Sequence, residues 1–548
     1  MTRSTSWLRI PSSGVPVLLL AFVLVACLEQ GCSGDNDNRE PTPGLWVDTS
    51  GDRQLLIVTT EALHEVAQEY ATYRQGQGYL VTVVTTEQAL EDAGGGASLA
   101  DAVQSWTLDW ADTALQDAAD PAALQLYLLL IGDALEGSAD DPTYIPVVPG
   151  EGDFVGDFAY GDLDGDGAPE VAIGRLPMRF PEEVRAYLER VQEYENQRSP
   201  GPWNKRLSAC AGEGGFGPDI DYLLEYAATR IFESLSYDID ITMTYAAASS
   251  PYYLPPSLWD DDYVERYNAG AVLQPYIGHT LGWANTSALE TPSRRGFVAY
   301  LSCSDGTFQS SSTPGGLADE MLMHPAGPMN SLAATDWSHP YGNAVLALEL
   351  SVALINDRAP TYGLALAWAK QQMLYSDSLL RAELDVAADA FLDEPAEHLI
   401  RTHIVMYNLL GDPAIDPGFP LGRVTFDGPE SAAPGDTITV TGSATADRDG
   451  NPMPEGEVTV TLEVERAEIP GDLIPVDGQP TTEQALANHA TANNKIITSA
   501  TGTVTNGRFE VQLTIPYAGV ATGRHYLKGF ALSSTSDAMG SAPITIRR

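Results

Sequence analysis

The stretch that decides the fold is residues 54–90, QLLIVTTEALHEVAQEYATYRQGQGYLVTVVTTEQAL. An apolar run at 54–59 predicts a β-strand, and a second apolar run at 79–85 predicts another. The segment between the runs carries apolar residues at helical spacing, namely Leu63, Val66, Ala67 and Tyr70. A strand, a helix and a second strand in this order predict a parallel pair with the helix packed on one face.

The same alternation continues along the chain. Helices are predicted near 97–117 and 181–196, and strands at 126–132 and 170–174. Strands that are apolar throughout are typical of parallel sheets covered by helices on both faces. The segment SPGPWNK at 199–205 resembles a hinge, and the alternation begins again after it.

The second part of the chain is α/β and the last part is all-β. Strands are predicted at RLSACAG (206–212), AVLQPYIG (271–278) and FVAYLSC (297–303). Beyond about residue 420, Thr/Val-rich alternating runs separated by Gly, Asn and Pro predict an immunoglobulin-like sandwich. We therefore predict two side-by-side α/β subdomains with mostly parallel sheets, followed by this sandwich. The predicted boundaries are 53–200, 201–418 and 419–548.

The amino-terminal 52 residues are predicted to be an export signal and a tether. An apolar run at 15–27 follows Arg3 and Arg9, and it is shorter than the roughly 20 residues of a membrane-spanning helix. The stretch LVAC at 24–27 resembles a bacterial lipobox, in which cleavage precedes the cysteine and a lipid is attached to its sulfur. We predict a signal peptide at 1–26, lipidation of Cys27 and a disordered tether at 27–52. Cleavage of a simple signal peptide near Cys32 is the alternative.

Export and charge together limit the partners. The mature protein is expected at the cell surface or anchored to the outer membrane, with a periplasmic or fully secreted protein as the alternative. The net charge of −46 repels phosphate backbones and anionic lipids, so we predict no nucleic-acid partner and membrane contact only through the lipid. Cations, divalent metal ions among them, are favoured partners.

Cys303 and His279 both stand where a predicted strand gives way to a loop. Catalytic groups of parallel sheets gather at the carboxyl ends of the strands, so the two side chains are expected at one edge. An imidazole that removes the proton of a thiol is the minimum equipment for acyl transfer. The alternatives are a buried structural cysteine with a hydrogen-bonding histidine, or a Cys210–Cys303 disulfide.

Six stretches, in this order, resemble the gingipain family of cysteine peptidases, which are relatives of caspases and clostripain. They are LLIVTTEALHEVAQEYATYRQGQGYLVTVV (55–84), LLLIGD (128–133), GDFAYGDLDGDGAPEVAIGRLPMR (156–179), YIGHT (276–280), LSCSDGTF (301–308) and YNLLGDPAIDP (407–417). The resemblance covers roughly residues 54–415 and implies that both α/β subdomains are caspase-like.

The resemblance also implies which residues act. Cys303 would be the nucleophile and His279 the general base, with the backbone N–H groups of Gly278 and Cys303 binding the oxyanion. Glu170 would orient the histidine, and Trp337 would flank the substrate pocket, although a packing function for Trp337 is the alternative.

The chain departs from the family at Thr280, since the family usually has glycine directly after the histidine. A β-branched residue is penalised at positive φ, so a turn that requires such an angle would be strained by threonine. If the turn requires such an angle, lowered activity or none is the expected consequence.

An acidic segment, GDLDGDGAPE, adds a metal prediction. Asp162, Asp164 and Asp166 at alternate positions resemble the front half of a calcium loop, although Ile173 stands where the loop's last glutamate is expected. We predict a structural calcium ion here and no organic cofactor; a solvated acidic turn is the alternative. Glu170 cannot easily be a calcium ligand and orient the histidine at once, so the two assignments compete.

The sequence therefore predicts an exported, lipid-anchored cysteine endopeptidase that cleaves protein or peptide substrates through an acyl-enzyme. Two alternatives stay open. An amine could replace water and make the protein a sortase-like transpeptidase, or both folded parts could form a surface module that binds partners without catalysis.

Overall fold

The computed structural model describes residues 51–547 except 95, 136–139, 198, 213, 216–217, 280–285, 291–293, 295, 311–314, 390–391 and 393. The predicted signal peptide, the lipidation site at Cys27 and Thr280 lie outside the described residues, so those statements stay predictions. Among the helices that the structure does describe, none is long and apolar enough to cross a membrane.

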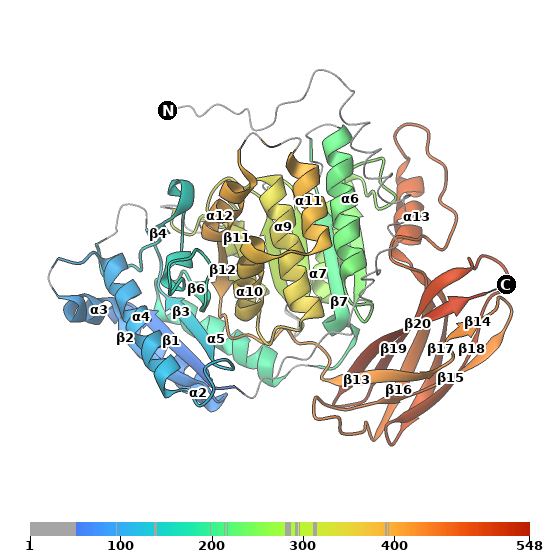
Figure 1. Cartoon of the computed structure of the whole chain (residues 1–548), viewed down its shortest axis with the longest axis horizontal. Coiled ribbons are helices and arrows are strands. Elements are labelled where there is room, and N and C mark those ends of the chain that lie inside the picture. Colours follow the sequence, from blue (N-terminus) through green and yellow to red (C-terminus); the bar gives the residue numbers. More distant parts are fainter. Residues whose placement is uncertain are drawn as a thin grey trace.

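A single ten-stranded sheet runs through the α/β part of the chain (Figure 1). In spatial order its strands are β2 (Leu80–Thr85), β1 (Arg53–Thr59), β3 (Gln125–Ile131), β6 (Ala172–Leu176), β12 (Tyr407–Gly411), β11 (Asn330–Ala334), β10 (Phe297–Leu301), β9 (Leu273–Ile277), β7 (Arg206–Ala211) and β8 (Asp240–Tyr245). The predicted parallel α/β architecture is confirmed. The strands of the two predicted subdomains lie side by side and join through β6 and β12.

The two halves of the sheet run in opposite directions. Strand β12 pairs parallel with β6 but antiparallel with β11, whereas all other neighbours in the sheet are parallel. The carboxyl ends of β9 and β10 therefore share an edge with the amino ends of β3 and β6.

Helices cover both faces of the sheet, as the apolar strands predicted. Along β1, Leu55 packs in one cluster with Tyr70 of α2, while its neighbour Leu56 packs in another with Val103 of α4. The helices of this part are α2 (His64–Gly76), α3 (Thr86–Ala93), α4 (Leu99–Asp117), α5 (Pro181–Asn196), α6 (Pro218–Ser234), α7 (Trp259–Ala269), α8 (Leu317–Met323), α9 (Pro340–Ser351), α10 (Tyr362–Tyr375), α11 (Leu379–Asp389) and α12 (Ala396–Met406).

A buried ionic cluster ties the amino-terminal helices to the end of β12. Asp412 is fully buried and accepts hydrogen bonds from Arg74 Nε at 2.8 Å and from the Tyr70 hydroxyl at 2.6 Å. Arg74 also contacts Glu195 of α5 at 3.0 Å. A buried charge is tolerated only when it is paired, so these residues depend on one another.

The carboxyl-terminal part is all-β, as predicted, and we call it the β unit. Its strands in spatial order are β13 (Gly422–Gly428), β15 (Thr437–Ala444), β18 (Arg508–Thr514), β17 (Ile496–Thr505), β16 (Glu455–Glu463), β19 (Gly523–Leu532), β20 (Asp537–Ile546) and β14 (Ser431–Ala432). A further pairing of β13 with β20 closes the sheet on itself into a barrel-like ring. The immunoglobulin-like assignment stays a prediction.

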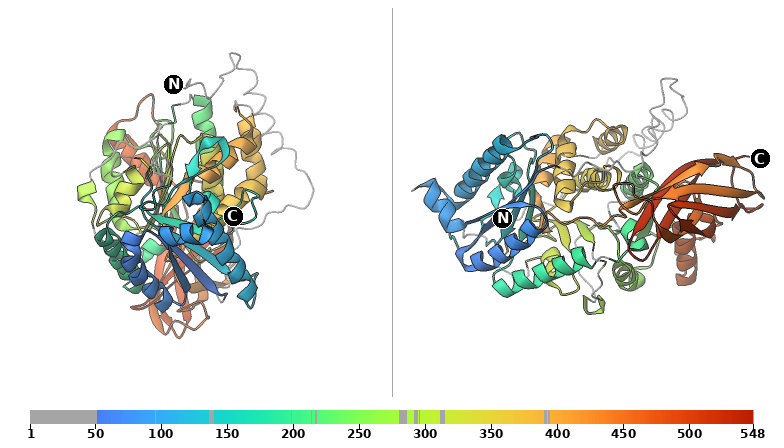
Figure 2. Two further views of the ribbon diagram at one scale, coloured as in Figure 1. Left: turned by 90° about the vertical axis from the view of Figure 1, so that its left-hand side faces the viewer. Right: turned by 90° about the horizontal axis from the view of Figure 1, so that it is seen from below.

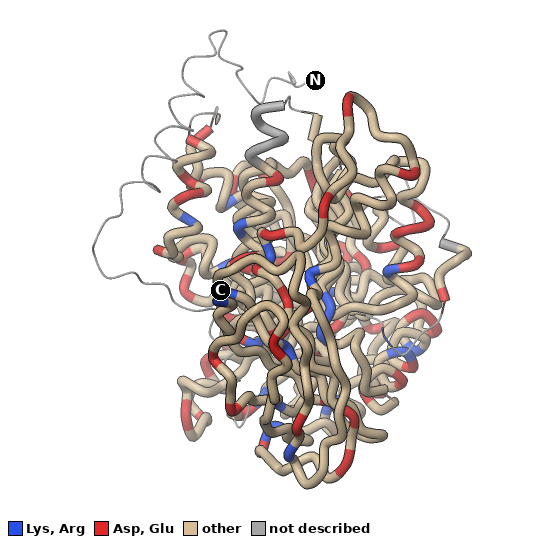
Figure 3. The backbone as a smooth tube through the Cα atoms, turned by 90° about the vertical axis from the view of Figure 1, so that its right-hand side faces the viewer, with Lys and Arg blue, Asp and Glu red and all other residues tan. Residues whose placement is uncertain are grey.

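The β unit lies at the β8 end of the large sheet (Figure 2). Between β16 and β17 the chain leaves it as an excursion over residues 464–495, which carries α13 (Thr482–Asn493) along the α/β part (Figure 1). Acidic residues are scattered over many elements of the chain (Figure 3).

Candidate active site

Cys303 and His279 come to the same edge of the sheet. Strands β9 and β10 are parallel neighbours with Ile277 opposite Leu301, and each predicted site residue follows its strand by two positions. Both side chains line one cavity of about 370 Å³. His279 is exposed and Cys303 is half-buried, so substrate can reach both groups.

The thiol of Cys303 is not part of a disulfide. Its Sγ donates to the carbonyl oxygen of Ser338 at 3.5 Å, and the Ser338 hydroxyl lies 3.9 Å from the sulfur. Cys210 is not part of a disulfide either, so the alternative of a disulfide between the two is wrong. Strand β9 separates their strands, and burial raises the pKa of the Cys210 thiol to about 12, which keeps it protonated.

The turn after Cys303 is tightly held. Ser304 has a φ of 56°, a left-handed conformation that costs a residue with a side chain about 1–3 kcal/mol. Its backbone N–H donates to Asp336 at 2.9 Å, and the hydroxyl of Ser302 donates to the buried Asp305 carboxylate. The segment around the thiol is therefore fixed by the end of β11 and by its own side chains.

His279 is oriented by a backbone carbonyl. Its Nε2 lies 2.7 Å from the carbonyl oxygen of Gly214, and because a carbonyl only accepts, Nε2 carries the hydrogen. Gly214 belongs to the loop after β7, which is anchored where the Gly212 N–H donates to Ile277 at 2.8 Å. Sequence reasoning missed this loop, although the glycine-rich GEGG at 212–215 directly after a strand was an available signal. The acidic residue of that stretch, Glu213, lies outside the described residues.

The structure does not bring Glu170 to His279. One carboxylate oxygen of Glu170 accepts from the backbone N–H of Leu163 at 2.8 Å, and Glu170 does not line the cavity. Burial and the neighbouring aspartates raise the pKa of Glu170. Glu170 thus helps to close the acidic turn and does not orient the histidine in this structure.

The backbone N–H of Gly278, a predicted oxyanion donor, already makes a hydrogen bond within the protein. It donates to the carbonyl oxygen of Leu301 at 3.3 Å, because the pairing of β9 with β10 continues one residue past the strand end. That N–H is therefore not available to a substrate in this structure.

Trp337 lies at the cavity, where the resemblance places it. Its side chain is 53% exposed and lines the same space as Cys303. The segment that carries Trp337 is held by His403, whose Nε2 accepts from the N–H of His339 at 2.9 Å while its Nδ1 donates to Leu399 at 2.6 Å. Burial lowers the pKa of His403 to about 4, so this anchor is neutral. Sequence reasoning missed His403, which lies far from the site along the chain.

A polar network joins the nucleophile strand to the Trp337 segment. Asn343 of α9 donates to the Leu301 carbonyl at 3.2 Å and to the Ser338 hydroxyl at 3.0 Å. The Tyr407 hydroxyl donates in turn to Asn343 at 2.7 Å. One asparagine thus fixes both the end of β10 and the residue that contacts the thiol.

The deeper wall of the cavity is largely apolar. Ala227 and Ile231 of α6 and Ala347 of α9 form two sides, and Met243 and Tyr245 of β8 form another. A space of this kind suits one side chain of a bound peptide.

The acidic turn forms a separate cluster. One oxygen each of Asp162, Asp164 and Asp166 lies within 4.8 Å of the others. Gly165 and Gly167 adopt φ angles of 77° and 94°, which lets the turn fold tightly around these oxygens. Burial and the other two carboxylates raise the pKa of Asp162. Clustered carboxylate oxygens are the ligands that Ca²⁺ prefers, so the three residues fit such an ion.

Comparisons with known proteins assign the chain to a family. A family model described as peptidase family C25 matches residues 48–418. Gingipain R, an Arg-specific cysteine proteinase, is 15% identical with a TM-score of 0.49, covering 92% of this chain and 100% of its own. A complex of the pro- and mature domains of RgpB from Porphyromonas gingivalis is 15% identical with a TM-score of 0.48, and the match covers 90% of this chain and 100% of that chain. A structure described only as a protease is 15% identical with a TM-score of 0.50, and the match covers 92% of this chain and 98% of that chain. This likeness shows the fold alone. No curated protein matches the chain.

Proposed function

The chain belongs to peptidase family C25 and is a cysteine-type peptidase, and on this premise we propose an endopeptidase with Cys303 as nucleophile and His279 as general base. Its substrates are proteins or peptides. The observation that carries the proposal is the position of the two side chains, which follow adjacent parallel strands and line the same cavity.

The proposed reaction begins with proton transfer from the thiol to His279. Because Nε2 carries its hydrogen toward Gly214, Nδ1 is the unprotonated nitrogen of the neutral ring and would accept that proton. The Cys303 sulfur attacks the amide carbon, and the resulting tetrahedral oxyanion collapses to a thioester as His279 protonates the leaving amine. Water, deprotonated by His279, then hydrolyses the thioester and regenerates the thiol.

A peptide probe that alkylates thiols tests this pairing directly. We expect an acyloxymethyl ketone peptide to label wild-type protein at Cys303, and His279→Ala to slow labelling by about 10²–10⁴-fold, because the base is lost. The matched control is His398→Ala, since His398 lines the same cavity but is paired with Glu151 at 2.7 Å. Equal labelling rates in wild type and His279→Ala would contradict the dyad and favour the surface-binding alternative.

We further propose that the acidic turn binds calcium as a structural ion. Asp162, Asp164 and Asp166 would hold it, and its charge would offset the repulsion among three carboxylates. Calcium at a hundred times its Kd is expected to raise the free energy of unfolding by about 2.7 kcal/mol. Thermal unfolding with calcium and with a chelator measures this, and Asp162→Asn is expected to abolish the difference.

The matched control for the calcium proposal is Asp447→Asn. Asp447 is an aspartate in a turn of the β unit, where it accepts from the N–H of Asn451 at 3.0 Å. A calcium response that persists in Asp162→Asn, or that disappears equally in both variants, would count against this site. Glu170→Gln belongs to the same series, and we expect it to weaken the calcium response while leaving probe labelling of Cys303 unchanged.

A further inference from the structure

Strand β8 is the outer strand of the large sheet, and its free edge is covered from outside the sheet. Its inner side pairs with β7, with Ala209 opposite Met243. At Tyr245 the outer side is covered by a local loop: the Tyr245 N–H donates to Tyr252 at 2.9 Å, and the Leu254 N–H donates to Tyr245 at 3.0 Å. Met243 is covered differently, by a side chain.

That side chain is Asn493 of the β unit. The N–H of Met243 donates to Asn493 Oδ1 at 2.7 Å, and Asn493 Nδ2 donates back to the Met243 carbonyl at 2.9 Å. One amide thus satisfies both backbone groups of Met243, as a neighbouring strand would. Asn493 is the last residue of α13, in the excursion that leaves the β unit beside the α/β part (Figure 1).

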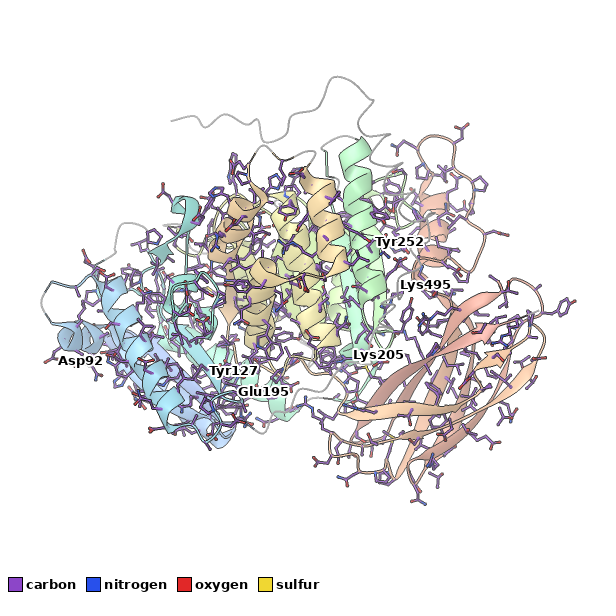
Figure 4. All side chains as sticks on the ribbon, viewed as in Figure 1. Asp92, Tyr127, Glu195, Lys205, Tyr252 and Lys495 are labelled. Carbon is purple, nitrogen blue, oxygen red and sulfur yellow. The ribbon has the colours of Figure 1, made fainter. Side chains whose placement is uncertain are left out.

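Two neighbouring contacts hold the excursion in the same place. His489, four residues before Asn493 on α13, has its Nε2 3.1 Å from the Thr244 hydroxyl of β8. Lys495 Nζ donates to the Tyr252 hydroxyl at 3.1 Å, and both residues lie at the junction of the two parts (Figure 4). The excursion therefore contacts β8 and the loop that follows it.

The same strand also lines the cavity. Met243 and Tyr245 line the space that holds Cys303 and His279. We propose that Asn493 is a positioning residue for substrate: it fixes β8 at Met243, and so the β unit maintains one wall of the peptide-binding cavity. This inference rests on the proposed function of that cavity.

The proposal separates substrate binding from thiol chemistry. In the sheet, β8 pairs with β7, whereas His279 follows β9 and Cys303 follows β10, so Asn493 acts on a strand that pairs with neither of the strands preceding these two residues. Met243 is only 6% exposed, and backbone groups left without a partner there would draw the strand toward water. Displacement of the wall weakens peptide binding, while a small alkylating reagent does not touch the wall.

The chain offers a matched control in Asn488. Its side chain makes the same double hydrogen bond, accepting from the Ile474 N–H at 2.7 Å and donating to the Ile474 carbonyl at 2.9 Å, but within the excursion itself. We expect Asn493→Ala in the full chain to raise KM for peptide substrates about tenfold with kcat nearly unchanged. Asn488→Ala is expected to leave KM within about twofold of wild type. Alkylation of Cys303 by iodoacetamide should proceed at the wild-type rate in both variants.

Two results would overturn the proposal. One is a wild-type KM in Asn493→Ala, and the other is an alkylation rate that falls in step with kcat/KM, which would indicate general damage to the site. Asn493→Asp keeps the acceptor but loses the donor, so it is the milder variant if alanine impairs folding. For this variant an intermediate KM supports the proposal and a wild-type KM counts against it.

Hydrogen exchange distinguishes failure of this inference from failure of the proposed function. Amide exchange in β8 is expected to quicken about tenfold in Asn493→Ala and to stay unchanged in Asn488→Ala. This readout does not need turnover. A wild type that cleaves no peptide would refute the endopeptidase, and unchanged exchange in Asn493→Ala would refute the positioning of β8.

Discussion

Replacement of Cys303 by alanine is expected to lower kcat/KM for peptide substrates by about four orders of magnitude or more, because no acyl-enzyme can form. The thiol is half-buried and its hydrogen bond to the Ser338 carbonyl oxygen is long, at 3.5 Å, so the loss of its sulfur should not disturb the fold. Turnover of a fluorogenic peptide library by purified wild type and variant measures the effect. Equal melting temperatures would show that chemistry alone has been lost.

Cys210→Ala is the matched control for this prediction. Cys210 is the other cysteine among the described residues, and burial holds its pKa at about 12, so its removal should change kcat/KM by less than about twofold. Turnover that survives in Cys303→Ala would refute this nucleophile.

Adding a peptide amine as acceptor decides between the two acyl-transfer reactions: a ligated product indicates transpeptidation, and cleavage alone indicates hydrolysis.

The largest loss of stability is expected from Asp412→Ala, at about 3–5 kcal/mol of the free energy of unfolding. Asp412 is fully buried between Arg74 and the Tyr70 hydroxyl, and its second oxygen accepts from the Ala414 N–H at 2.8 Å. Without it, Arg74 loses one of its two ion pairs and keeps the one to Glu195, so a buried guanidinium is left half-paired. Urea unfolding followed by hydrogen exchange in α2 and β12 reports this part of the molecule separately from the β unit.

An exposed ion pair supplies the comparison for Asp412. Asp427 and Arg508 of the β unit lie 3.1 Å apart with side chains that are 57% and 70% exposed. Asp427→Ala should therefore cost less than about 1 kcal/mol. Equal losses from the two substitutions would mean that burial does not determine the strength of the Asp412 cluster.

Local sequence patterns predicted the elements better than their assembly. The strand predicted at 54–59 is observed at Arg53–Thr59, and the helix predicted near 181–196 is observed at Pro181–Asn196. The spacing of apolar residues over a short stretch of sequence is enough to indicate such elements. The joining of the two halves through β12 was not predictable. The apolar stretch YNLLG predicts a strand, but it does not indicate which strands pair with it.

The same contrast holds for the site: the sequence predicted which residues come together, but not their detailed contacts. Cys303 and His279 were placed at one edge because each follows an apolar strand, a feature visible in the sequence. The occupied N–H of Gly278 depends on how far two strands pair, and the binding of Glu170 in the acidic turn depends on a side-chain rotamer. Neither property has a signature in the order of residues. The contacts of His403 and Gly214 join segments that are distant in the chain, so only the fold shows them.

The central position of β12 in the sheet determines when the sheet can be completed during synthesis. The strand occupies the middle of the sheet, yet it is translated after its neighbours β6 and β11. Until residues 407–411 leave the ribosome, the nascent chain carries two incomplete half-sheets, each with an unpaired edge that can pair with the wrong strand. Maturation of the whole enzyme therefore waits for its last α/β strand, and a chain that stops short of it would remain two incomplete pieces.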